Sequence, residues 1–277
     1  MVSVRCLGAF FGEPQGAAKA LSPHVRWPLN KLFALLRSQA LAAIPVGAHV
    51  AAASLIDALI AAGSADQFEL VTLPAMNPPS AERLARWSGG PGGPDVIRIL
   101  DYRGLITGRA APEFKVWLDA YGFLPVSLEI RNWVMRRLYP VIALHHTFNY
   151  HSMTHNWLLR LLLGGSQPCD SIVCGSKSAQ RALLNLLGRV SDDFTSDFGG
   201  RIHYRGRVDV IPLCVDTEKF RPADKRLARR VLELPADAVI LLYLGRLSLT
   251  DKADVLPLVR VFSELVKSSG GSDLILS

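Results

Sequence analysis

The sequence predicts an α/β fold built on parallel sheets, because short apolar strands alternate with amphipathic helices along most of the chain. Two segments show this alternation most clearly. Ser171–Cys174 is a short apolar run, and residues 177–187 follow it with apolar side chains at helical spacing. Residues 239–244 form a second apolar run, and residues 255–266 repeat the helical spacing. Such strand–helix–strand units are typical of parallel sheets.

The N-terminal half of the chain predicts a series of short elements. We leave residues 1–31 unassigned, and the apolar run 31–37 fits either a strand or the start of a helix. The Pro-, Gly- and Ser-rich residues 74–95 predict a loop. The remaining predictions are a helix over 48–62 that ends at Gly63, strands over 68–73 and 96–100, helical stretches near 112–121 and 127–138, and a strand over 140–144.

The C-terminal half of the chain is patterned more regularly. Ser176 is a suitable N-cap for the helix over 177–187, and Gly188 is expected to end that helix. A strand is expected over 208–211, before Pro212, and a last strand begins near 273. Residues 213–237 are charged and contain proline, so we place a domain boundary there.

Composition and charge narrow the class of protein. The chain has 277 residues, of which 49% are hydrophobic and 20% charged, as in a globular protein. Its net charge of +7 favours an acidic partner: a nucleotide diphosphate, an anionic membrane surface or nucleic acid. A solvated basic surface without a specific partner is the alternative. The four cysteines form no CxxC pair, which favours a reduced, cytosolic setting.

Several common chemical motifs are absent from the sequence. It contains no GxGxxG fingerprint, no P-loop, no GxSxG elbow and no DxD pair. The apolar run 157–163 is interrupted by Arg160 and is too short to span a bilayer, and no signal-peptide pattern opens the chain. We therefore expect neither a dinucleotide fold of the common type nor a membrane-spanning segment.

Histidines concentrate between residues 145 and 155. His151 and His155 have a spacing that can bind zinc on a helix, but no HExxH glutamate or third ligand accompanies them, so we expect no metal. His145 and His146 follow a predicted parallel strand, where ligands of such sheets bind. A histidine there can donate to a sugar hydroxyl or move a proton near neutral pH. The alternative is a histidine that only hydrogen-bonds loop carbonyls.

Two cations follow the predicted strand 239–244. Arg246 offers a planar fork of donors and Lys252 a point charge, and together they suit a diphosphate. The N-terminus of the following helix would add a favourable dipole. The alternative is that both are solvated surface side chains.

Taken in order, these pieces resemble the GT4-type (group 1) retaining glycosyltransferases. The resemblance covers about residues 45–277 and is most specific over 207–262. The Leu244-Gly-Arg-Leu loop with Lys252, and the helix that follows, resemble the start of the family's nucleotide-sugar domain. The earlier matching segments are Gly47-Ala-His-Val-Ala-Ala, Val141-Ile-Ala-Leu-His-His146, Cys169-Asp-Ser-Ile-Val-Cys-Gly-Ser176 and Arg207-Val-Asp-Val-Ile-Pro-Leu-Cys-Val-Asp-Thr-Glu-Lys-Phe-Arg-Pro222.

The chain also departs from that family's pattern. Cys214 stands where glycine is usual, Lys252 lies one residue further from Arg246 than in many members, and Ala253 replaces a common glycine. The family's paired-glutamate segment would lie beyond residue 277. We therefore expect a C-terminally truncated enzyme that transfers no sugar by itself and exposes apolar surface around 239–277.

The resemblance implies a GT-B-like fold. Residues 1–222 would form a Rossmann-like acceptor-side domain, and residues 223–277 a linker and the incomplete start of a second Rossmann-like, donor-binding domain. The enzyme would transfer a sugar from a nucleotide-diphosphate sugar to a glycan, lipid or small-molecule acceptor, with retention of configuration. The alternatives are a non-catalytic GT-B-like binding module and a sugar-nucleotide epimerase of the same fold.

The resemblance also assigns roles to residues. His146 would be the catalytic histidine that contacts the sugar, Arg246 and Lys252 would bind the donor diphosphate, and Gly47 would belong to an acceptor or phosphate loop. No metal or other cofactor is expected, because the cations stabilise the leaving diphosphate. We expect a cytoplasmic protein, with peripheral contact to an anionic membrane as an option and with no nucleic-acid partner.

Overall fold

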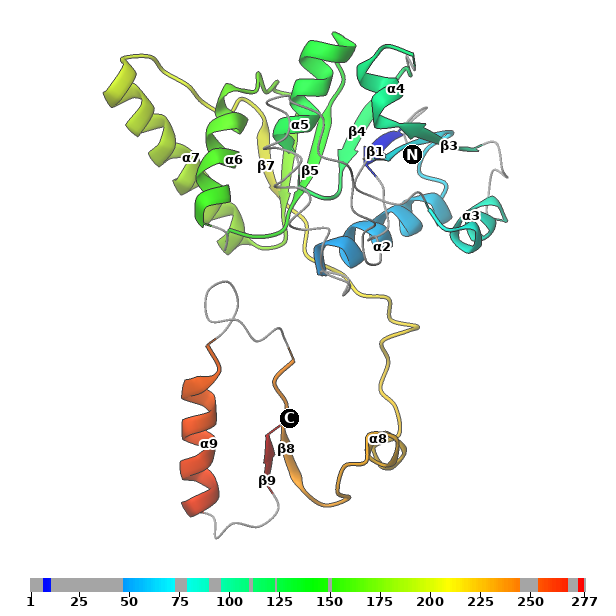
Figure 1. Ribbon diagram of the computed structural model, residues 1–277, viewed down its shortest axis with the longest axis vertical. Coiled ribbons are helices and arrows are strands. Elements are labelled where there is room, and N and C mark those ends of the chain that lie inside the picture. The colour runs from blue at the N-terminus through cyan, green and yellow to red at the C-terminus, as the bar shows by residue number, and fades with distance from the viewer. Residues whose placement is uncertain are drawn as a thin grey trace, which may run out of the picture. The chain divides into compact units, whose positions relative to one another are not determined.

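The computed structural model describes residues 7–10, 47–72, 79–89, 96–109, 112–122, 124–148, 151–244, 254–268 and 274–276. The chain divides into two compact units (Figure 1). Unit 1 contains residues 1–146 and 155–212, and unit 2 contains residues 147–154 and 213–277.

Unit 1 is built on one parallel sheet of seven strands in the order β3-β2-β1-β4-β5-β6-β7. This confirms the predicted α/β class with a Rossmann-like sheet. The strands are β1 (Leu7–Phe10), β2 (Phe68–Thr72), β3 (Ile97–Asp101), β4 (Val116–Asp119), β5 (Val141–His145), β6 (Ser171–Cys174) and β7 (Arg207–Val210).

The strand order reverses between β1 and β4. From β1 the chain moves outward to β2 and β3, and it then returns to β4 on the other side of β1 before continuing to β7. In open parallel sheets, ligands bind outside the carboxyl ends of the strands next to such a reversal. The reversal therefore points to the residues that follow β4, and the residues that follow its neighbour β5 lie at the same edge.

Helices lie against this sheet in unit 1 (Figure 1). In α2 the buried residues Ala52, Ile56 and Ile60 repeat every four positions and form one stripe toward the core. The predicted end of this helix at Gly63 is confirmed by the left-handed φ of +57° there. The helices are α2 (Gly47–Ala61), α3 (Ala81–Ser88), α4 (Tyr102–Ile106), α5 (Leu124–Glu129), the π-helix η2 (Ile130–Met135), α6 (His151–Leu163) and α7 (Lys177–Phe198).

Before α7, three sequence expectations for unit 1 differ from the structure. The helix expected near 112–121 is wrong: its centre is the strand β4, whose residues Trp117 to Asp119 are all buried. A strand covered on both faces lacks the alternation that identifies half-exposed strands. The predicted loop 74–95 contains α3, which Ser80 caps by accepting from the Arg83 amide. The unassigned N-terminal residues contain β1, and the run 31–37 lies outside the described residues.

Helix α7 is twice as long as the sequence suggested. It does not end at Gly188 but continues to Phe198, where Gly199 takes the left-handed φ of +71°. The buried stripe Leu183, Leu187 and Val190 runs through the position of Gly188. The packing of this stripe outweighs the low helix propensity of one glycine.

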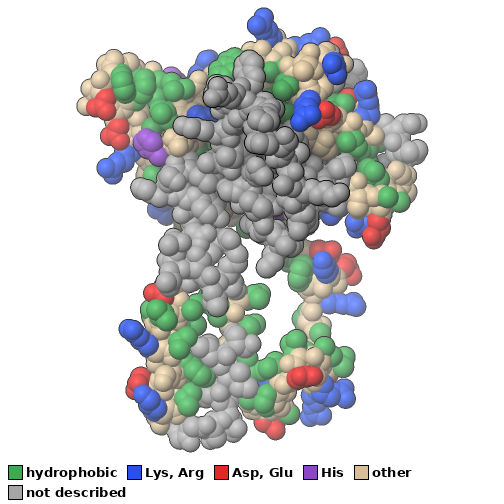
Figure 2. Space-filling model, viewed as in Figure 1, with side chains coloured by type: hydrophobic (Ala, Val, Ile, Leu, Met, Phe, Trp, Pro, Cys, Tyr) green, Lys and Arg blue, Asp and Glu red, His purple; other side chains and the backbone are tan. Residues whose placement is uncertain are grey.

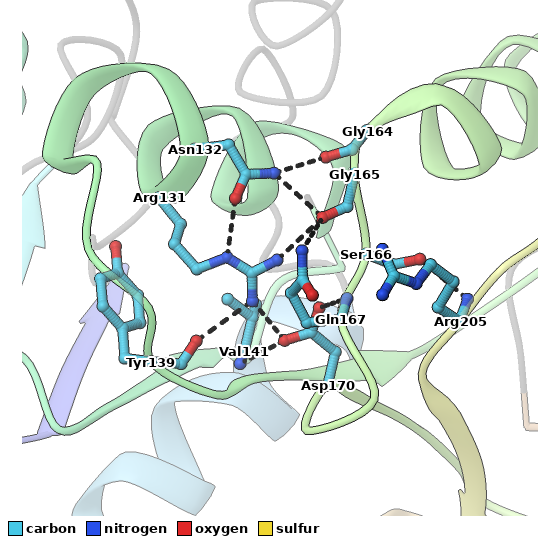
Figure 3. Close-up of polar contacts among 10 residues, drawn as sticks. All are labelled: Arg131, Asn132, Tyr139, Val141, Gly164, Gly165, Ser166, Gln167, Asp170 and Arg205. Carbon is cyan, nitrogen blue, oxygen red and sulfur yellow. Dashed lines mark hydrogen bonds and ion pairs between the residues drawn. The ribbon is translucent and has the colours of Figure 1, made fainter.

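A buried ion pair joins the elements on the amino side of β5 and β6 (Figure 3). Arg131 of η2 is 1% exposed, and its guanidinium donates to Asp170 and to the Tyr139 carbonyl. Asp170 also accepts from the amides of Val141 and Gln167, at 3.0 and 2.7 Å. The pair is therefore fully hydrogen-bonded, as a buried charge pair requires.

Unit 2 is a small parallel α/β fragment. Strand β8 (Val239–Leu241) pairs with β9 (Leu274–Leu276), α9 (Leu256–Ser268) lies between them in sequence, and α8 (Lys225–Val231) precedes them. The expected exposed apolar surface is confirmed among the described residues: Leu242, Leu244 and Val261 are 68%, 91% and 67% exposed. The predicted helix is present as α9, but its apolar stripe remains largely exposed.

Candidate functional site

The site begins with the turn that follows β4. Asp119 ends the strand fully buried, and its carboxylate accepts from the Tyr121 amide at 3.2 Å and the Ser127 hydroxyl at 2.7 Å. Ser127 in turn accepts from the Trp117 indole at 3.1 Å. These bonds fix the backbone of residues 120–122 at the carboxyl edge of the sheet.

His146 lies against this turn, directly after β5. Its Nε2 is 2.7 Å from the Ala120 carbonyl oxygen. A carbonyl can only accept, so Nε2 donates and the Nδ1 lone pair becomes the acceptor or base of a neutral ring. The β4 turn thus selects one tautomer of the predicted catalytic histidine.

Gly122 allows the two strand ends to approach each other. Its φ is +82°, and a Cβ there would lie 3.2 Å from the Leu144 carbonyl and 3.7 Å from the His146 ring. Both the backbone angle and the close approach therefore require glycine at this position.

His145 faces a different environment from its neighbour. Its ring stacks on Trp157 of α6 with centroids 5.7 Å apart, and the Trp157 indole donates to the Gly122 carbonyl at 3.0 Å. Burial, and secondarily the charge of His146, lower the pKa of His145 to about 4. At neutral pH His145 is therefore an uncharged packing residue.

The first turn of α2 supplies a residue that the sequence did not single out. His49 contacts the Tyr121 ring at a centroid distance of 5.6 Å. Burial lowers the pKa of His49, and the charge of nearby His146 lowers it further. Two imidazoles, one on α2 and one after β5, thus approach each other at the carboxyl edge. Imidazoles beside a tyrosine suit the hydroxyls of a polyol or sugar.

Gly47 opens α2 at the same edge of the sheet. A Cβ there would meet no other described atom within 4 Å, and its φ is not left-handed. Neither packing nor backbone conformation within the described residues demands glycine. The amides at the start of α2 are nevertheless suited to an anion.

The two predicted diphosphate ligands, Arg246 and Lys252, lie outside the described residues. Of the four site residues predicted from the sequence, the structure thus places Gly47 and His146 on neighbouring elements. Among the residues with described side chains, His, Cys, Asp and Glu nowhere gather in a group of three that could hold a metal ion. Nor does any described helix have the length and apolar character needed to span a bilayer.

The sequence did not single out His49, Trp157 or the turn that follows β4. A polar residue after an apolar run is the signal that could have found Asp119, had 116–119 been recognised as a strand. His49 lies within the segment that resembles the glycosyltransferases, but its place beside Tyr121 and near His146 depends on how α2 packs in the folded chain.

Sheet order and site position together define a Rossmann-like α/β domain whose candidate site lies at the carboxyl edge of the parallel sheet. No family model matches the chain. A D-inositol 3-phosphate glycosyltransferase 2 of Catenulispora acidiphila is 44% identical over 61 residues, which are 22% of this chain and 14% of the relative. The D-inositol 3-phosphate glycosyltransferase of Acidothermus cellulolyticus is 31% identical over 102 residues, 37% of this chain and 19% of the relative.

A third relative supports the same relationship. The D-inositol 3-phosphate glycosyltransferase of Streptosporangium roseum is 32% identical over 90 residues, 32% of this chain and 18% of the relative. Part of the chain is therefore homologous to GT4-type glycosyltransferases. The matches span less than a fifth of the length of each of these relatives.

Proposed function

We propose that this protein is a retaining glycosyltransferase in which unit 1 binds the acceptor and unit 2 contributes to binding a nucleotide-diphosphate sugar. The observation that carries the proposal is His146, held in one tautomer by the Ala120 carbonyl at the carboxyl edge of the parallel sheet. The partial homology to GT4-type glycosyltransferases supports the reaction class.

Each predicted site residue has a part in this reaction. His146 contacts the transferring sugar, and its Nδ1 can accept from a hydroxyl. Arg246 and Lys252 stabilise the negative charge that develops on the leaving diphosphate, which needs no metal. Gly47 and the following amides of α2 approach a phosphate of the donor or acceptor.

For the acceptor, we propose a polyol phosphate of the inositol phosphate class. The three relatives bear D-inositol 3-phosphate in their names, although each match is partial. The edge that contains His146 combines hydroxyl-binding groups, namely His49 and Tyr121, with the helix N-terminus at Gly47. These two chemistries correspond to the ring hydroxyls and the phosphate of such an acceptor.

Acceptor binding can be measured by calorimetry with the chain and D-inositol 3-phosphate. We expect saturable binding, with inositol lacking the phosphate binding on the order of tenfold more weakly. His49→Ala and His146→Ala should weaken binding, whereas His145→Ala, a matched control on the same strand, should change it little because His145 packs on Trp157. Equal behaviour of all three variants, or no binding at all, would refute the acceptor assignment.

The transfer step needs a second experiment, a donor-hydrolysis screen over several nucleotide-diphosphate sugars. It uses the longest form of the protein that its gene encodes. Arg246→Ala and Lys252→Ala should each lower the rate on the order of a hundredfold. His146→Ala should slow transfer and leave nucleotide diphosphate binding nearly intact. Acceptor binding without transfer would favour a binding module, and interconversion of the free nucleotide sugar would favour an epimerase.

A further inference from the structure

Large apolar side chains are exposed at the end of η2 and in the residues that follow it. Trp133, Val134 and Leu138 are 68%, 37% and 75% exposed, and all three lie within six consecutive residues. Single exposed apolar residues are ordinary on protein surfaces, but a cluster that includes a tryptophan marks an interaction surface. We refer to residues 133–138 as the 133–138 turn.

Cations surround these apolar side chains. Arg136 and Arg137 are exposed within the turn. Lys115 is exposed on the segment that precedes β4, and Glu113 of that segment forms an ion pair with Arg137. The Arg137–Glu113 pair has an N–O distance of 3.0 Å, but both side chains are more than half exposed, so water screens it. In the space-filling view, Lys and Arg side chains gather along the upper edge of unit 1, where α4 and the end of α5 lie (Figure 2).

The turn is held firmly on the inside. Arg131 and Asn132, the two residues before Trp133, point inward and donate to the Gly164 and Gly165 carbonyls of the loop after α6 (Figure 3). Tyr139, the residue after Leu138, is only 4% exposed. Both ends of the turn are therefore anchored, so the exposed side chains are presented by an ordered backbone. Such preorganisation reduces the conformational entropy that is lost on binding.

We propose that the 133–138 turn docks on the surface of an anionic lipid bilayer. Tryptophan favours the interface between lipid headgroups and acyl chains, and Leu138 and Val134 can enter the apolar boundary beneath it. Arg136, Arg137 and Lys115 face the negative surface potential of anionic lipid. A second copy of the chain fits this surface less well, because two like-charged faces would repel each other.

The position of the turn decides what docking does to the candidate site. The turn precedes β5 and lies at the amino edge of the sheet, whereas His146 follows β5 at the carboxyl edge. A bilayer contact through the turn leaves the carboxyl edge open to water. The proposal is therefore independent of the proposed function, and each can fail without the other.

The test is sedimentation of the 277-residue chain with vesicles of phosphatidylcholine, alone or mixed with phosphatidylglycerol. We expect binding to the mixed vesicles only, decreasing as salt is raised. The partition coefficient should fall on the order of tenfold in Trp133→Ala, and by a similar factor in the double variant Arg136→Gln with Arg137→Gln. Because these side chains are exposed, we expect the variants to fold. An unchanged melting temperature would confirm that they do.

Two control variants separate this surface from others. Phe198→Ala removes another exposed aromatic side chain of unit 1, 74% exposed on α7, and should leave the partition unchanged. Arg226→Gln with Arg230→Gln removes two exposed cations of α8 in unit 2 and should have less effect than the substitutions in the turn. A control that weakens binding as much as Trp133→Ala would show general adsorption and overturn the proposal.

Fluorescence provides a second measurement that does not depend on sedimentation. Mixed vesicles should shift the emission of the chain toward the blue, and Trp133→Phe should abolish that shift. Brominated lipid should quench the chain but not the Trp133→Phe variant. The proposal is overturned if the chain does not bind vesicles. If Trp133→Ala then changes the oligomeric state, the surface is an interface between copies of the chain.

Discussion

Buried titratable side chains link the stability of unit 1 to pH at the level of single residues. His145 has a pKa of about 4 in the folded chain, where burial and His146 oppose its charge, against an ordinary value of 6.5. The unfolded chain therefore binds a proton at a higher pH than the folded chain. The stabilisation is complete above about pH 6.5 and is lost as the pH falls toward 4.

The first prediction concerns this pH dependence. The difference in pKa corresponds to about 3 kcal/mol between neutral and acidic pH. His145→Gln should flatten the fall of melting temperature between pH 7 and pH 4, and His203→Gln, the same substitution at an exposed position, serves as the matched control. If the slope of His145→Gln equals that of the parent chain, His145 does not bind protons differently in the two states.

The second prediction concerns the Arg131–Asp170 pair. Arg131→Met leaves the carboxylate of Asp170 buried and uncompensated, so the free energy of unfolding should fall by about 3–5 kcal/mol in urea titrations. Arg137→Met breaks the exposed pair with Glu113 and serves as the matched control. Its cost should stay below about 1 kcal/mol. Similar losses for the two variants would mean that the buried pair contributes no more than a surface contact.

The sequence predicted that His146 follows a strand and that Gly47 lies at the start of a helix. It did not predict the residues that orient His146. His146 follows an apolar run, and that pattern is visible in one dimension. The Ala120 carbonyl, the Gly122 close approach and the His49 contact each join segments distant in the sequence. The pairing of β4 with β5 brings Ala120 and Gly122 to His146, and the packing of α2 brings His49 to the same edge. Neither arrangement is encoded in local sequence pattern.

Helix α7 shows how packing overrides local signals at the scale of an element. The rule that glycine ends a helix succeeded at Gly63, where φ is left-handed, and failed at Gly188, which lies in the middle of α7. The two positions look alike in the sequence. The difference is the buried residue Val190 beyond Gly188, which gives the helix a reason to continue.

The third prediction uses the two glycines of α7. Gly188→Ala should raise the free energy of unfolding by about 0.5–1 kcal/mol, because a Cβ there meets no described atom within 4 Å and alanine favours the helix. Gly199→Ala should lower it by about 1 kcal/mol, because φ is +71° at the helix end. Chemical denaturation of both variants measures the two signs. Two changes of the same sign would contradict the placement of the helix end.

At the scale of the whole molecule, the two units differ in how they cover apolar surface. The strands β2, β4 and β6 of unit 1 are largely buried, whereas Val239 and Leu241 of β8 in unit 2 are 57% and 39% exposed. The apolar pattern of 239–266 predicted its elements correctly. It could not predict their exposure, because burial depends on what the strand and helix pack against.

The fourth prediction follows from that exposed surface. The chain should bind a hydrophobic dye such as anilinonaphthalene sulfonate more strongly than a chain that ends at Pro222 and so lacks β8 and α9. Dye fluorescence at equal protein concentration measures the difference, and light scattering reports any accompanying aggregation. Equal dye binding would show that the apolar side chains of unit 2 are covered in solution.

The central place of β1 has a consequence for biosynthesis. Leu7 pairs with Phe68 on one side and with Val116 on the other, although β1 precedes both β2 and β4 in the sequence. Its two neighbours emerge only after long intervening stretches, and domains usually begin to fold while synthesis continues. One edge of β1 must therefore stay unpaired until β4 has been made. A chain translated from an internal start after Phe10 would have its sheet divided between β2 and β4.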